Sequence, residues 1–63
     1  MKEIFIIKDV KAKTFLITEN SVNEWADNEG KASAFYSYEE ARIHIVHKLQ
    51  KGLYLIEKLF IKY

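Results

Sequence analysis

Two histidines are the residues of this 63-residue chain best suited to chemistry. His44 and His47 stand three positions apart, which places them about 60° apart around a helix axis at 100° per residue. Two imidazoles at this spacing can share a metal ion, but zinc needs further ligands, and only Glu40 lies near in sequence. Because Glu40 is already engaged in capping the helix, the pattern favours two solvent-facing histidines. No metal site is predicted.

A serine and an acidic segment suggest two other chemistries. Ser37 lies near the histidines, but its position favours a helix N-cap over a nucleophile. The acidic segment carries four carboxylates and no basic residue: Glu19, Glu24, Asp27 and Glu29. Their spacing does not match the EF-hand loop, which alternates oxygen ligands around a glycine. The sequence therefore predicts a non-enzymatic protein with no catalytic residue and no cofactor.

One helix has a clear start and a clear stop. Ser37 and Glu40 have the spacing of a capping box, and Gly52 stands where a helix C-terminal glycine is expected. The acidic first turn and the basic last turn complement the helix dipole. One stripe should face a sheet: Tyr38, Ala41, Ile45 and Leu49, with Arg42 and Val46 along its flank. Ile43 falls on the opposite side, where it is exposed unless a partner covers it.

The remaining segments favour strands. Residues 2–8 and 13–18 are rich in isoleucine, phenylalanine and threonine and predict a hairpin, joined by a four- or five-residue loop without glycine. Residues 31–36 predict a third strand and residues 53–63 a last one, whose alternation slips at Glu57 and Lys58. Residues 19–30 predict a loop, with one or two helical turns from Val22 to Asp27 signalled by Ser21 and Glu24.

These elements predict an α+β fold in the order β-β-β-α-β. Three or four mainly antiparallel strands would form one sheet with the helix packed on one face, and residues 1–63 would form a single small domain. The chain has no cysteine, so a domain this small must rely on packing or on association with another chain. This raises the expectation of a homodimer.

Composition limits the location and the partners. No apolar run approaches the roughly 20 residues needed to span a bilayer, and the first eight residues are too short for a secretory signal. We therefore expect a cytoplasmic protein that does not enter membranes. The net charge of +1 is too small to identify nucleic acid or a membrane as a partner.

One sheet face lacks an obvious cover. If Ile4 and Ile6 face the helix, Phe5 and Ile7 point away from it, and leaving such side chains wet costs several kcal/mol. Two covers are possible: a protein partner or second copy, or the acidic segment folded back with Val22 and Trp25 as a lid. The predicted partner-binding residues are Phe5, Ile7, Phe15, Ile17 and Trp25, with Glu24, Asp27 and Glu29 as a charged rim.

The alternative hypothesis is a small nucleic-acid-binding regulator. A sheet with exposed aromatic residues and flanking lysines can stack single-stranded bases. The basic helix and the last strand provide five candidates for phosphate contacts: Arg42, Lys48, Lys51, Lys58 and Lys62. Against this hypothesis, Glu57 interrupts the strand and no glycine-aromatic RNA-binding signature occurs.

The order of element starts resembles small uncharacterised phage and prophage proteins. The similar features are the opening Phe5-Ile6-Ile7-Lys8, the second strand Lys13-Thr14-Phe15-Leu16, the lone Trp25, the segment from Lys31-Ala32 to Glu39-Glu40-Ala41, and the final Tyr54-Leu55-Ile56-Glu57-Lys58. The resemblance implies an accessory protein that binds and modulates another protein of host or phage. It implies no catalytic residue.

Overall fold

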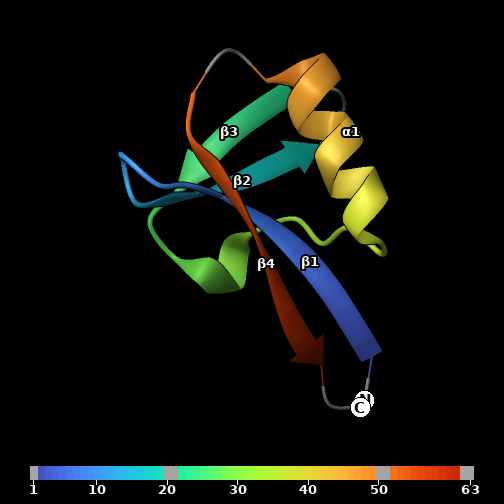
Figure 1. Cartoon of the computed structure of the whole chain (residues 1–63). Coiled ribbons are helices and arrows are strands. Elements are labelled where there is room, and N and C mark those ends of the chain that lie inside the picture. The colour runs from blue at the N-terminus through green and yellow to red at the C-terminus, as the bar shows by residue number, and fades with distance from the viewer. Residues whose placement is uncertain (1, 20–21, 50–51, 62–63) are drawn as a thin grey trace.

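The computed structural model, which describes residues 2–19, 22–49 and 52–61, contains one sheet and one α-helix (Figure 1). The elements run in the order β1 (Lys2–Asp9), β2 (Thr14–Glu19), β3 (Val22–Ala26), a 3-10 turn η1 (Glu29–Lys31), α1 (Tyr38–Lys48) and β4 (Tyr54–Ile61). The four strands are antiparallel in the spatial order β3-β2-β1-β4. The predicted α+β class, with one helix packed on an antiparallel sheet, is confirmed. No helix in these ranges is long and apolar enough to cross a bilayer.

Asp9 stabilises the turn of the hairpin between β1 and β2. The Asp9 carboxylate accepts hydrogen bonds from the backbone N–H groups of Lys11 and Ala12, both at 3.0 Å, and the Asp9 carbonyl accepts from the Lys13 N–H at 2.8 Å. This side-chain turn takes the place of a glycine turn. Lys13 nevertheless adopts the left-handed region with φ of 59°, a conformation that favours glycine.

The third strand is not where the sequence predicted it. Residues 22–26, predicted as a loop with a helical turn, form β3 and pair with β2 along its length, from Phe15↔Ala26 to Glu19↔Val22. Pairing with β2 overrides the weak local preference here, since Asn23 and Glu24 disfavour a strand while Val22 and Trp25 suit a pleated surface.

Residues 33–35, predicted as part of a strand, instead form a wedge between β1 and β2. The two strands pair only at Lys8↔Phe15 and Asp9↔Thr14 and then separate. Phe35 bridges the gap by exchanging two backbone hydrogen bonds of 2.8 Å with Phe5. The backbone groups that the diverging strands would leave unpaired are thereby satisfied.

Both faces of the sheet are covered, each by a different segment. Ile7 and Leu16, with 0% exposure, pack with Ala41 of α1. On the opposite face, Ile4 and Ile6 are buried with Phe15. The partly buried Ala32 and Ala34, which follow η1, pack against that second cluster. Figure 1 shows α1 and η1 apart, with β1 between them.

The face assignment made from the sequence is therefore reversed. Phe5 and Ile7 lie under α1, whereas Ile4 and Ile6 face away from it. All four successive residues are apolar, so the pattern could not choose between the two faces. The predicted lid is also wrong, since neither Val22 nor Trp25 belongs to the cluster around Ile4.

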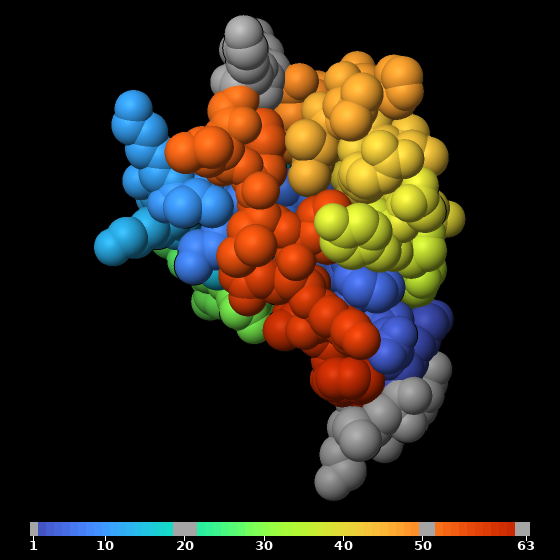
Figure 2. Space-filling view, viewed as in Figure 1, coloured from blue at the N-terminus to red at the C-terminus, as the bar shows by residue number. Residues whose placement is uncertain are grey.

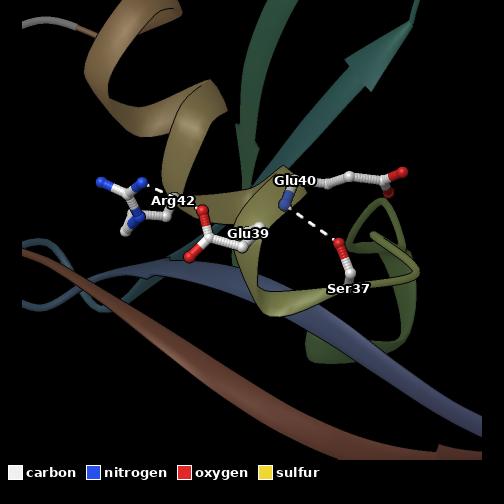
Figure 3. Close-up of polar contacts among 4 residues, drawn as sticks. All are labelled: Ser37, Glu39, Glu40 and Arg42. Carbon is white, nitrogen blue, oxygen red and sulfur yellow. Dashed lines mark hydrogen bonds and ion pairs between the residues drawn. The ribbon is translucent and has the colours of Figure 1, made fainter.

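The helix begins as predicted. The Ser37 hydroxyl accepts a hydrogen bond from the Glu40 N–H at 3.1 Å (Figure 3), and the Glu40 carboxylate accepts from the Tyr36 N–H at 3.2 Å. Ala41, Ile45 and Leu49 of the predicted stripe pack on the sheet. Tyr38, also from that stripe, is exposed and meets Phe5 edge to face at 6.3 Å.

The helix ends earlier than predicted. Its last residue is Lys48, and Leu49 caps it in an extended conformation. Gly52 does not adopt a positive φ, so it is not the left-handed cap that its position suggested. The flanking Gln50 and Lys51 lie outside the described residues.

Candidate protein interface

The free edge of β4 is the main candidate for a binding surface. The strand order places β4 at one side of the sheet, where, among the described residues, it pairs with β1 alone. Because Phe5 directs its backbone groups toward Phe35, its neighbours Ile4 and Ile6 direct theirs toward β4. In the antiparallel register Ile4 pairs with Leu59, and Ile6 pairs with Glu57.

The alternating backbone of β4 therefore presents every second residue outward. The N–H and C=O groups of Ile56, Lys58 and Phe60 point away from β1, since these residues stand opposite the odd-numbered positions of β1. Another extended chain could pair with these groups. A backbone hydrogen bond from the Val10 N–H to the Leu53 carbonyl at 3.1 Å agrees with the same alternation.

Three apolar side chains of β4, and Leu53 just before it, are exposed to solvent. The exposed fractions are 70% for Leu53, 49% for Leu55, 59% for Phe60 and 43% for Ile61. In the space-filling view of Figure 2, β4 forms a continuous orange-to-red ridge from the top of the molecule toward the bottom. Leu53, Leu55 and Ile61 share the face of Leu59, away from α1, whereas Phe60 lies on the helix side. Exposed apolar side chains gathered along one strand are typical of an interaction surface.

The two charged side chains of β4 are both engaged by β1. Lys8 Nζ lies 4.0 Å from Glu57 Oε1, and Lys58 Nζ lies 3.5 Å from Glu3 Oε1. Edge strands are usually protected by charged side chains, especially lysine, by proline or by a bulge. The β1–β4 register runs from Lys2↔Ile61 to Asp9↔Tyr54 without an extra residue, and β4 contains no proline. The described part of this edge therefore lacks a proline and a bulge, and its one lysine, Lys58, is paired with Glu3.

The slip in alternation at Glu57 and Lys58 is thus not a bulge. Each face of β4 is apolar in part, with Ile56 packing under α1 and Leu59 packing on the opposite face. The sequence signalled this two-sided character, but sequence reasoning assigned the partner surface elsewhere. It missed four residues of the candidate interface: Leu53, Leu55, Phe60 and Ile61.

The predicted apolar partner residues do not form an open surface. Ile7 is fully buried, and Phe15 is buried with an exposed fraction of 9%. Phe5 and Ile17 are half-buried and lie on opposite faces, because Phe5 packs under α1 while Ile17 shares the face of Phe15. The prediction that these four side chains make one uncovered face is wrong.

Trp25 lies on the helix side of the sheet, so it is not the predicted lid over the opposite face. Its ring stacks on Tyr54 with 5.8 Å between centroids and 8° between planes, and its exposed fraction is 38%. Glu24, next to it in β3, points to the other face. Asp27 and Glu29 are exposed beyond the end of the strand. The acidic residues and the tryptophan therefore do not form a single rimmed patch.

A polar latch connects β3 to the helix. The Asn23 amide donates to the Lys48 carbonyl at 3.1 Å, and its oxygen lies 3.1 Å from His44 Nε2. Partial burial, assisted by the nearby Lys48 charge, lowers the pKa of His44. A hollow of about 310 Å³ lies beside this latch, lined by Asn23, Trp25, Lys48, Leu49 and Tyr54. No group of three or more metal-ligating side chains occurs within the described ranges.

The basic residues of the alternative hypothesis are dispersed or engaged. Arg42 Nη2 lies 3.0 Å from Glu39 Oε2 (Figure 3), and this contact lowers the pKa of Glu39. Lys58 is paired with Glu3 on the sheet, and Lys48 lies at the last turn of α1. Lys51 and Lys62 lie outside the described residues. Of the three described candidates, Arg42 and Lys48 lie on α1 and Lys58 lies on β4, and two of the three are paired with a carboxylate.

Comparison of the chain with protein-family models, curated proteins and solved structures finds no match.

Proposed function

We propose that this chain is a non-enzymatic protein-interaction module that binds an extended segment of another polypeptide chain by adding it as a strand beside β4. The observation that carries the proposal is the outward backbone edge at Ile56, Lys58 and Phe60, flanked by exposed apolar side chains. Main-chain hydrogen bonds supply affinity in such complexes, and pockets or rows for alternate side chains supply specificity.

The energetics favour an apolar strand as the partner. Fully burying a leucine or phenylalanine side chain is worth about 1.5 to 3 kcal/mol. Leu53, Leu55 and Phe60 are each half-exposed or more, so each has a part of this free energy left to gain. A partner strand with apolar residues at every second position would cover the row formed by Leu53 and Leu55.

The proposal also accommodates the sequence resemblance to phage accessory proteins. Such a protein would act by occupying a segment of a host or phage protein, which requires a docking edge and no catalytic group. The source of the partner is not part of the proposal.

A peptide-display selection tests the proposal. Random peptides of about ten residues, the length that matches a long strand, are selected against the chain, and binders are then tested for binding to a Lys58→Pro variant. Proline at position 58 removes an outward donor and leaves the β1–β4 bonds of Ile4 and Ile6 in place. Glu24 lies on β3, the other edge strand, and Glu24→Lys, which keeps the backbone donor at that position, serves as the control.

The expected binders alternate apolar and polar residues and lose at least tenfold in affinity for Lys58→Pro but not for Glu24→Lys. Their binding should slow amide hydrogen exchange at Ile56, Lys58 and Phe60. Binders that select other surfaces, or that tolerate Lys58→Pro, would overturn the proposed role of the β4 edge.

A further inference from the structure

We infer that the strand that pairs with β4 is β4 of a second copy of this chain, arranged antiparallel about a two-fold axis at Ile56. This inference rests on the proposed function and specifies its partner. A self-pairing edge is isologous, because the same residues supply both sides of the contact.

Backbone parity restricts the possible registers. Ile56, Lys58 and Phe60 carry the outward groups, and in an antiparallel ladder an outward residue pairs with an outward residue. Even-numbered positions of one copy must therefore stand opposite even-numbered positions of the other. Odd-numbered residues then also oppose one another, so Leu53 and Leu55 of both copies lie on the same face of the extended sheet.

Repulsion between like charges distinguishes these registers. The two pairings that use most of the described strand are centred on Ile56, which aligns residues 52–60 with themselves, and on Glu57, which aligns residues 53–61. The second opposes Glu57 to its own copy at the closely spaced type of pair, where like charges destabilise. A pairing centred on Lys58 is shorter and opposes two lysines.

The pairing centred on Ile56 gives every charged side chain of the strand an acceptable neighbour. Lys58 stands opposite Tyr54 of the other copy, where an ammonium can lie over an aromatic ring. Leu53 stands opposite Leu59, and Glu57 stands opposite Leu55. The apolar or aromatic residues in these pairs are half-buried or exposed in the single chain: Leu53, Tyr54, Leu55 and Leu59. The pairing therefore covers surface that is otherwise in water.

A cysteine scan tests the register directly, because the chain contains no cysteine. Ile56→Cys would place two thiols at a hydrogen-bonded pair with about 5.5 Å between Cα atoms, inside the range of about 4.4–6.8 Å that a disulfide needs. Glu57→Cys would place them on a diagonal of roughly 7–8 Å, and Lys58→Cys would place them farther apart. Ile56→Cys is therefore expected to form a disulfide-linked dimer at least tenfold faster than the other two variants under mild oxidation.

A charge pair at Leu55 provides a second test that does not depend on a core substitution. Leu55 is 49% exposed and pairs with Lys8 of its own chain. In a single chain, Leu55→Glu should therefore be tolerated better than Leu55→Lys. In the inferred dimer, position 55 faces Glu57 of the other copy, so sedimentation equilibrium should show at least tenfold tighter association for Leu55→Lys than for Leu55→Glu.

The outcomes separate this inference from the proposed function. Fastest cross-linking at Glu57→Cys or Lys58→Cys, or equal association of the two Leu55 variants, would overturn the register. A chain that stays monomeric at several hundred micromolar overturns the inference of a second copy. If selected peptides still require an intact β4 edge in that case, the proposed function stands with a different protein as partner; if they do not, both fail.

Discussion

The hydroxyl of Ser33 holds the wedge of residues 33–35 against β2, and its removal should destabilise the fold. Ser33 Oγ accepts from the Thr18 N–H at 2.8 Å and donates to the Thr18 carbonyl at 3.3 Å. The Ser33 N–H separately donates to the Leu16 carbonyl at 2.9 Å. Ser33→Ala removes the first two hydrogen bonds and keeps the third, which is a backbone contact.

The expected loss follows from the burial of the contact. A buried donor left without an acceptor costs about 1–3 kcal/mol. The Thr18 N–H is only partly buried, and the 3.3 Å bond to its carbonyl is long, so we expect a loss of about 1.5 kcal/mol. For a domain of this size each kcal/mol lowers Tm by about 4–8 °C, which gives a decrease of about 6–12 °C.

Urea unfolding and thermal melting measure this loss, and hydrogen exchange locates it. The Thr18 amide should exchange faster in Ser33→Ala by more than the change in global stability requires. Ser33→Thr keeps a hydroxyl at the same position and serves as the matched control, with a smaller loss. A loss below about 0.5 kcal/mol in Ser33→Ala, within the usual range for a surface substitution, would show that the hydroxyl does not hold the wedge.

Three other substitutions test the local structure. Ser37→Ala removes the N-cap of α1 and should lower the free energy of unfolding by about 1 kcal/mol; an unchanged urea midpoint would contradict the cap. Lys13→Gly relieves a left-handed residue and should raise that free energy by up to about 1 kcal/mol, measured by the same titration, whereas destabilisation would contradict the assigned turn. The pKa of His44 is lowered in the fold, so the unfolded chain binds the proton more readily, and stability should fall as pH falls through about 6.5. His44→Gln should reduce the difference between urea midpoints at pH 7.5 and pH 5; a difference as large as that of the unaltered chain would exclude His44 as the source.

Local signals were sufficient to predict the helix. Its start depends on contacts within a few residues, between Ser37 and Glu40 and between Glu40 and Tyr36. The strands rich in isoleucine and phenylalanine were also predictable from composition. The third strand was not, because Asn23 and Glu24, which disfavour a strand, acquire their extended conformation by pairing with Thr18 and Ile17 of β2.

The candidate interface could not be derived without the strand order. The residue pattern of an apolar strand such as β4 does not indicate whether the strand lies at the centre or at the edge of a sheet. Only the observed order β3-β2-β1-β4 shows that no described strand pairs with its second side. The wrong assignment of Phe5 and Ile7 has a related cause, since four consecutive apolar residues contain no alternation that would identify a face.

The placement of β1 also affects how this chain folds. The pairing of Lys2 with Ile61, and the bridge between Phe5 and Phe35, join residues that are far apart in sequence. Closing such long loops costs entropy before any contact compensates for it, and proteins dominated by distant contacts fold in milliseconds to seconds. The hairpin of β2 and β3 is local and can form early. We therefore expect β4 to join the sheet late, because its pairing with β1 closes a loop that spans most of the chain, and its apolar side chains to stay exposed to other chains until then.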